Sequence, residues 1–175
     1  SGDVIFMDVG ASSARYSSDL TRCVPVSGKF TPTQKEVYNA VLRVKNAAAK
    51  MLKPGVIWAD YHVEVGKIMT EELIGLKLIT KKDVKDQDPD WPAYKKYFMH
   101  GTSHHMGLDT HDYGILTEPM TAGMVFTVVP GIYIPAENLG IRIEDDYVIQ
   151  AKGEALNLMA HIPITAEEIE ALMKA

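Results

Sequence analysis

Residues 4–26 read VIFMDVGASSARYSSDLTRCVPV, two apolar stretches separated by small and polar residues. This stretch predicts a β-hairpin in which residues 4–9 form a buried strand and the apolar residues after the loop return alongside it. Facing residues of an antiparallel pair have a constant sum of residue numbers. A loop centred on residues 13–14 would therefore place Asp8 opposite Asp19, with both carboxylates on one face.

Beyond the hairpin, the chain predicts helices first and strands later. Thr31-Pro32-Thr33-Gln34 combines a helix N-cap, a proline at the first helical position and a capping partner, and Pro54-Gly55 ends this first helix. The remaining expected elements are a helix over 59–76, a surface loop or short helix over 80–96, strands over 124–129, 131–134 and 140–150, and a last helix from 165 to 175. Strands followed by helices and then by strands predict an α+β fold.

The composition excludes several classes of protein. The chain has 175 residues, of which 46% are hydrophobic, and 18 basic against 23 acidic residues give a net charge of −5. These values predict a soluble globular chain, and the absence of a basic stripe or of a long apolar segment argues against a nucleic-acid or membrane partner. The single cysteine, Cys23, and the lack of a signal-peptide pattern predict a cytoplasmic protein.

Three acidic residues stand in apolar strand sequence. Asp8, Asp19 and Glu144 must each be paired, protonated or bound to a metal if they are buried, because an isolated buried carboxylate is costly. Three carboxylates in one place repel one another unless a cation is present. Divalent manganese, cobalt or zinc would relieve that repulsion and would accept an imidazole as a further ligand, for which His104 is a candidate.

Plainer interpretations exist for each of these residues. An aspartate near a hairpin is often a turn or surface residue, and Glu144-Asp145-Asp146 is compatible with a solvated acidic turn. Four of the six histidines, however, lie close together among three glycines: His100, His104, His105 and His111. His100 and His104 have the spacing of a zinc-binding helix, but no glutamate follows His100 and the glycines disfavour a helix, so that motif is rejected.

Five ordered segments together resemble the signature of the proline-specific metallopeptidases with the pita-bread fold, and most closely the Xaa-Pro aminopeptidases (aminopeptidase P). The segments are DVG at 8–10, YSSDLTR at 16–22, MHGTSHHMGLDTHD at 99–112, GMVFTVVPG at 123–131 and GIRIEDD at 140–146. The resemblance covers nearly the whole chain. It implies that residues 1–175 are the C-terminal portion of an α+β pita-bread catalytic domain, with an antiparallel curved sheet and flanking helices.

The same resemblance implies that the N-terminal half of the catalytic domain, and any preceding domain, lie outside this chain. An unpaired sheet edge and an apolar face are then expected to be exposed near the start of the sequence. A homo-oligomer is possible for the complete protein.

Four residues match metal ligands of that family. Asp8 would bind the first of two divalent ions, Asp19 and Glu144 would bridge both, and His104 would bind the second. A water or hydroxide between the ions would attack the peptide bond before a proline. The expected metal is manganese, with cobalt or zinc possible, and the expected partner is a peptide with proline in the second position.

Other matched residues would serve catalysis or substrate binding. His111 would donate a hydrogen bond to the substrate carbonyl, and His100 would line the proline pocket. Tyr133 and Arg142 match positions that line this pocket or support the site, and His100 and Arg142 are also counted as catalytic. His105 has no matched role and is interpreted as structural or as part of the pocket rim.

One residue departs from the family pattern where it matters for metal binding. Val129 stands where the family has a glutamate ligand of the second ion, and an isopropyl group cannot bind a cation, so the second site is expected to be weakened. The leading function is hydrolysis of the bond between an N-terminal residue and a following proline. The alternatives are an Xaa-Pro dipeptidase (prolidase) and a catalytically impaired binding module, for which Val129 is the only support.

Overall fold

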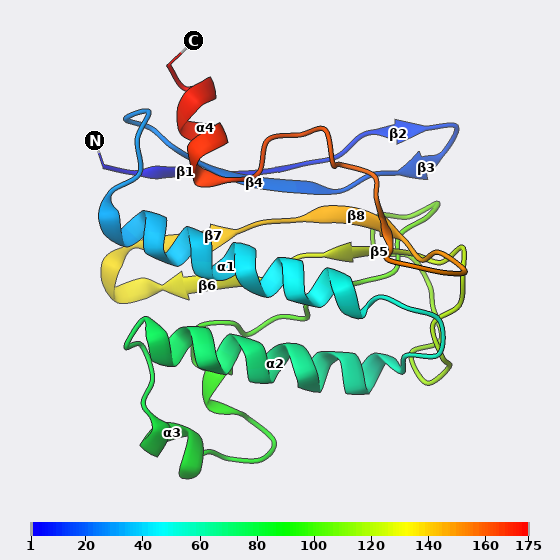
Figure 1. Cartoon of the computed structure of the whole chain (residues 1–175), viewed down its shortest axis with the longest axis horizontal. Coiled ribbons are helices and arrows are strands. Elements are labelled where there is room, and N and C mark those ends of the chain that lie inside the picture. Colours follow the sequence, from blue (N-terminus) through cyan, green and yellow to red (C-terminus); the bar gives the residue numbers. More distant parts are fainter. Residues whose placement is uncertain (1, 175) are drawn as a thin grey trace.

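Two long helices lie side by side along one side of a set of short antiparallel strands (Figure 1). The computed structural model describes residues 2–174. Helix α1 spans Pro32–Met51 and helix α2 spans Trp58–Gly75. The side chain of Thr31 accepts a hydrogen bond from the backbone of Gln34, and the Gln34 side chain accepts one in return, which confirms the predicted helix start.

In residues 2–174 the strands form four antiparallel sheets, three of two strands and one of three. Their bounds are β1 Val4–Val9 with β4 Leu20–Pro25, β2 Ser12–Ser13 with β3 Tyr16–Ser17, β6 Gly131–Ile134 with β7 Leu139–Arg142, and β8 Asp145–Val148 between β5 Val125–Val128 and β9 Leu156–Asn157. The pair β1 and β4 lies beside β7, and β4 also lies beside β8. Short helices complete the chain: α3 Lys81–Lys85, η1 Ala93–Lys96, η2 Pro135–Glu137 and α4 Ala166–Leu172. The predicted α+β architecture is confirmed.

The register of the first hairpin differs from the prediction. Asp8 faces Thr21, not Asp19, because the two-residue turn is formed by Ala14 and Arg15, which both have a positive φ, 50° and 70°. Neither residue favours the left-handed conformation, so the sequence carried no strong turn signal at this point. Side chains alternate with a period of two along a strand. A shift by two residues therefore keeps Asp19 on the same face as Asp8, as its diagonal neighbour.

The burial predicted for residues 4–9 is wrong. Strand β1 forms as expected, but the side chains of Ile5, Phe6, Met7 and Val9 are between 39% and 53% exposed. Among residues 2–174, β1 pairs only with β4, and its other edge meets no strand. An apolar sequence predicts a strand well, whereas the burial of that strand depends on what packs against it.

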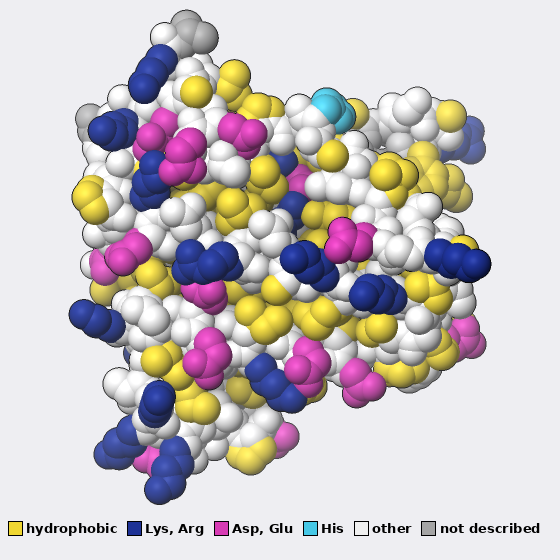
Figure 2. Space-filling model, in the orientation of Figure 1, with side chains coloured by type: hydrophobic (Ala, Val, Ile, Leu, Met, Phe, Trp, Pro, Cys, Tyr) yellow, Lys and Arg dark blue, Asp and Glu magenta, His cyan; other side chains and the backbone are white. Residues whose placement is uncertain are grey.

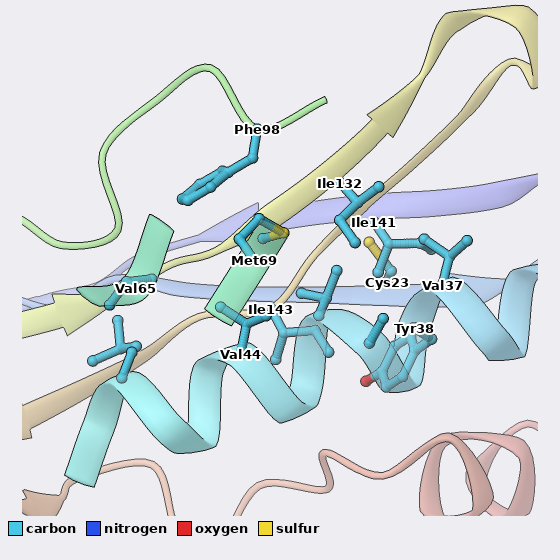
Figure 3. Close-up of a cluster of buried hydrophobic side chains, with 14 of the residues drawn as sticks. Cys23, Val37, Tyr38, Val44, Val65, Met69, Phe98, Ile132, Ile141 and Ile143 are labelled. Atoms are coloured by element: carbon cyan, nitrogen blue, oxygen red, sulfur yellow. The ribbon is translucent and has the colours of Figure 1, made fainter. Parts of the chain in front are cut away.

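The hydrophobic core lies between the helices and the strands (Figure 3). It contains Val37, Tyr38 and Val44 of α1, Val65 and Met69 of α2, and Cys23, Ile132, Ile141 and Ile143 from the strand region. Ile141 and Ile143 alternate with Arg142 and Glu144, which line a cleft instead. The packing of the two isoleucines against the helices therefore turns the two charged side chains towards the opposite side.

A buried ionic cluster joins α1 to the strands. Asp145 accepts hydrogen bonds from Arg22 at 2.6 Å, from Asn157 at 2.9 Å and from the Lys45 ammonium. Lys45 is only 2% exposed, and burial lowers its pKa despite the pairing with Asp145. Arg22 also donates to the backbone oxygen of Glu144 at 2.8 Å. The cluster thus fixes the chain at the β7–β8 connection and at the start of β8.

Replacing Lys45 by Met should lower the free energy of unfolding by about 3 kcal/mol, because it removes one partner of a buried ion pair. The expected loss is at the lower end of the usual range since Arg22 still pairs with Asp145. Urea unfolding measures the change. Lys50→Met, at an exposed position of the same helix, is the matched control and should change stability by no more than about 0.5 kcal/mol. Equal losses in the two variants would contradict a stabilising role of the cluster.

Candidate metal centre

A cleft of about 540 Å³ opens between the first hairpin, the histidine-rich loop and the end of β7. Its lining includes Asp8, Ser18 and Asp19 from the hairpin region, His100, Ser103, His104, Thr110 and His111 from the loop, and Val129, Arg142 and Glu144 from the strand region. The loop contains no helix, as the glycines predicted. Residues from three distant parts of the sequence therefore meet in one cleft.

Two groups of potential metal ligands share Asp19. Asp8, Asp19 and Glu144 each offer a carboxylate oxygen, and these atoms lie within 4.8 Å of one another. Asp19, His104 and His111 form a second group by the same measure. The structure therefore brings together all four residues for which the sequence predicted metal binding.

A hydrogen bond to the backbone of the next residue orients the His104 imidazole in the cleft. Its Nδ1 lies 3.0 Å from the carbonyl oxygen of His105, which can only accept, so Nδ1 carries a proton and Nε2 faces the cleft. Nε2 is 3.5 Å from Asp19 Oδ2 and 3.7 Å from Glu144 Oε1. Two ligands bound tetrahedrally at about 2.1 Å from one ion stand roughly 3.4 Å apart. The spacing of the three groups fits one divalent ion.

The electrostatics of the cleft favour a positive charge. Burial alone would lower the pKa of His104, but the carboxylates of Asp19 and Glu144 outweigh burial and raise it to about 10. His104 in turn lowers the pKa of Asp19 against the effect of burial. Without a metal ion, a protonated imidazole supplies the cation among the carboxylates. A divalent ion would take its place and release that proton.

Two buried oxygen atoms without hydrogen-bond partners among the described residues also indicate that the cleft favours a cation. Glu144 Oε1 and Asp146 Oδ1 are buried and accept no hydrogen bond from residues 2–174. A buried polar atom without a partner is unfavourable, and a cation in the cleft would satisfy Glu144 Oε1. Asp146 uses its other oxygen to accept the backbone N–H of Asp19 at 3.0 Å. Burial and the charges of Glu144 and Asp19 raise the pKa of Asp146 to about 7.

Arg142 contacts the carboxylate of Asp8 directly. Its guanidinium forms an ion pair with Asp8, and its Nε donates to the hydroxyl of Thr21 at 3.2 Å. The same guanidinium lies 4.4 Å from the ring centre of Phe6. The Asp8 side chain is half exposed, so Arg142 restricts a carboxylate that would otherwise be free to move. Of the predicted roles for Arg142, this geometry matches support of the site.

His100 and Tyr133 form a hydrogen-bonded pair. His100 Nδ1 donates to the carbonyl oxygen of Gly101 at 2.8 Å, so Nε2 accepts from the Tyr133 hydroxyl at 2.7 Å. Burial lowers the pKa of His100 and raises that of Tyr133, which keeps both side chains neutral near pH 7. His100 lines the cleft, and Tyr133 fixes the direction of its ring.

The other two histidines of the loop lie in different environments. His111 is exposed in the cleft, and its ring stands edge-on to that of His104, with centres 4.1 Å apart. His105 instead stacks on Trp58 at 5.7 Å and contacts Phe126 at 4.4 Å. His105 therefore packs in an aromatic cluster, in keeping with the structural role expected for it.

Val129 forms part of the cleft wall. Its backbone N–H donates to the carbonyl oxygen of Thr102 at 2.7 Å, and its side chain is only 8% exposed. The position is close enough to the ligand groups to line the same cleft, yet it offers no donor atom. An apolar side chain thus occupies the position at which the family resemblance places a glutamate ligand.

Two polar residues of the site were not singled out from the sequence. Thr21 donates to Glu144 Oε2 at 2.7 Å, and Asp146 holds the backbone of Asp19. The alternation of side chains along a strand could have found Thr21, because it stands two residues after Asp19. Nothing in the sequence distinguished Asp146 from an acidic turn residue.

A solvent-open cleft in which carboxylates and imidazoles converge is typical of metal-dependent hydrolases. Comparison with known proteins agrees: residues 1–151 match the profile described as metallopeptidase family M24. The chain belongs to this family.

Similar proteins include enzymes named Xaa-Pro aminopeptidase or aminopeptidase P. The chain is 40% identical to the Xaa-Pro aminopeptidase of Escherichia coli strain K12 over 99% of its length, and 37% identical to that of Haemophilus influenzae over 98%. It covers 42% of each of these relatives. A zinc-substituted Escherichia coli aminopeptidase P in complex with product superposes with a TM-score of 0.89 at 38% identity, covering 99% of this chain and 41% of that one. The expected pita-bread fold is confirmed.

The face of the molecule that displays α1 and α2 is mixed in charge. Figure 2 shows basic and acidic side chains interspersed on the face that displays α1 and α2. In residues 2–174, no helix combines the length and the apolar composition that a bilayer crossing requires.

Proposed function

We propose that the protein hydrolyses the peptide bond between an N-terminal residue and a following proline in a metal-dependent reaction. The observation that carries the proposal is the convergence of Asp8, Asp19, His104 and Glu144 on one cleft, with ligand separations that suit a divalent ion. The names of the M24 relatives support the substrate class.

The residues of the cleft have different roles in the proposed reaction. When bound, two divalent ions, expected to be manganese with cobalt or zinc as alternatives, supply the Lewis acidity that activates water and polarises the scissile carbonyl. Asp8, Asp19, His104 and Glu144 hold them. His111, exposed beside His104, donates a hydrogen bond to the substrate carbonyl.

The neighbouring residues position the ligands and the substrate. Arg142 keeps the half-exposed Asp8 carboxylate in place. His100, fixed by Tyr133, forms a neutral wall suited to the apolar ring of proline. A charged imidazolium here would compete with the cations for the carboxylates, and the neutral form of His100 avoids this competition.

Two other functions remain in competition. A dipeptidase acting on Xaa-Pro would use the same ligands, and Val129 favours a protein that binds peptides with little or no turnover. A cytoplasmic location and self-association remain predictions.

One assay separates the three functions. The intact protein, loaded with Mn²⁺, is given an Xaa-Pro-Xaa tripeptide and an Xaa-Pro dipeptide side by side while its metal content and its peptide binding are measured. We expect cleavage of the tripeptide before proline, and loss of that activity with a chelator. Cleavage of the dipeptide alone would identify a dipeptidase. Bound peptide without cleavage of either would overturn the enzymatic proposal in favour of a binding module.

A further inference from the structure

Thr21 is a buried residue that joins two parts of the candidate metal centre. It lies on β4, has no exposed surface, and forms an antiparallel bridge to Glu144, whose backbone N–H donates to the Thr21 carbonyl at 3.1 Å. Its hydroxyl is 2.7 Å from Glu144 Oε2 and 3.2 Å from Arg142 Nε. The side chain therefore touches a ligand carboxylate and a guanidinium at once.

The direction of both hydrogen bonds follows from the chemistry of the groups. The Nε of Arg142 can only donate, so the Thr21 oxygen accepts from it. A carboxylate can only accept, so the single hydroxyl proton of Thr21 points to Glu144. Donation thus runs from Arg142 through Thr21 to Glu144, and each end of this relay is strengthened by a charge.

This relay determines how the Glu144 carboxylate faces the cleft. One oxygen is held by Thr21, and the other, Oε1, is buried without a hydrogen-bond partner among residues 2–174 and lies 3.7 Å from His104 Nε2. Holding one oxygen of a planar carboxylate fixes the direction of the second. The free oxygen is the one that can bind an ion between Glu144 and His104.

We propose that Thr21 is a positioning residue for the metal centre. Its hydroxyl orients Glu144 and couples it to Arg142, which is itself paired with Asp8 in the same cleft. The inference rests on the proposed function only in that the cleft binds a divalent ion. It does not depend on which peptide is cleaved.

The test compares Mn²⁺ binding by the intact protein and its Thr21 variants, using isothermal titration calorimetry after chelator treatment. Thr21→Val keeps the shape of the side chain but removes the hydroxyl, and should weaken binding about 10- to 100-fold, as expected for a group that orients a ligand. Thr21→Ser restores the hydroxyl and should recover most of the affinity. Thr21→Ala, which also lacks the hydroxyl and relieves crowding, replaces Thr21→Val if the latter does not fold.

The matched control is Thr102→Val. Thr102 is as buried as Thr21, but its hydroxyl forms no hydrogen bond within the described part of the chain, so Mn²⁺ affinity should not change. Arg142→Lys tests the coupling: it keeps a positive charge but loses Nε, and the double variant with Thr21→Val should lose less affinity than the two single losses combined.

Unchanged Mn²⁺ affinity in the variants that lack the hydroxyl, or no recovery with serine, would overturn the proposal. An equal loss in Thr102→Val would do so too, because it would show a general packing effect. Failure of the peptide assay alone, with the Thr21 series behaving as expected, would count against the peptidase function and leave the positioning role intact.

Discussion

Asp19→Asn is expected to abolish the binding of divalent ions at the cleft. Asp19 is the only residue common to both ligand groups, so a loss of its charge affects every arrangement of ions that the cleft permits. Asparagine preserves the shape of the side chain, and the backbone N–H at this position still has Asp146 as its acceptor. Titration with Mn²⁺, followed by metal analysis of the dialysed protein, should find no tightly bound ion.

Two further measurements make this result specific. The variant should remain folded, because removing one of three neighbouring carboxylates relieves repulsion in the metal-free protein. NMR titration should show a lower pKa for His104, which is about 10 with Asp19 present, since one of the two carboxylates that raise it is gone. Asp60→Asn, at an exposed position of α2, is the control and should bind Mn²⁺ normally. An unaltered titration of the Asp19 variant would disprove its role as a shared ligand.

Val129→Glu is expected to raise both the metal content and the rate of cleavage before proline. Val129 lines the cleft in the wall next to the ligand groups, so a carboxylate at this position can complete the coordination of the ion held by His104. Loss of a residue that only orients a ligand weakens binding about 10- to 100-fold, and a directly bound carboxylate should contribute at least that much. Calorimetric Mn²⁺ titration and kcat/KM for an Xaa-Pro-Xaa peptide measure the two effects.

The control for this gain is Val129→Gln, which has nearly the same shape as glutamate but no charge. It should produce little of the increase, because a neutral amide is a weaker ligand for a divalent ion. If the glutamate variant binds no more metal and reacts no faster than the chain with Val129, the assignment of residue 129 as a ligand position is wrong.

The local elements were predictable because their signals are local. The start of α1 depends on Thr31, Pro32 and Gln34, which lie within one turn of one another, and the structure contains the capping box that they predict. Strand β6 also begins and ends at the predicted residues, Gly131–Ile134. In each case, the information needed lies within a few residues of the boundary.

Features that depend on distant contacts were not predictable in the same way. The predicted register of the first hairpin was wrong because Ala14 and Arg15 form its turn without a typical turn sequence. Strand β1 was expected to be buried because apolar composition says nothing about which partner covers it. The single strand expected over 140–150 divides into β7 and β8, because β7 pairs with β6 whereas β8 pairs with β5 and β9.

In the candidate site, too, some residues could be predicted from the sequence and others could not. Asp8, Asp19, His104 and Glu144 were identified from ordered motifs, whose spacing the sequence records directly. Thr21 was not identified because threonine is common in strands. Its role depends on the position of its hydroxyl between two charged groups, which the sequence does not show.

The break between β7 and β8 sends three consecutive acidic residues in three directions. Glu144 faces the cleft, Asp145 pairs with Arg22 and Lys45, and Asp146 holds the backbone of Asp19. The direction of each side chain is determined by its position in the order of residues along the chain. Deleting one residue before Glu144 would shift all three at once, moving Asp145 to the cleft position of Glu144 and Glu144 to the core position of Ile143. The length of this segment therefore determines the role of all three acidic side chains together.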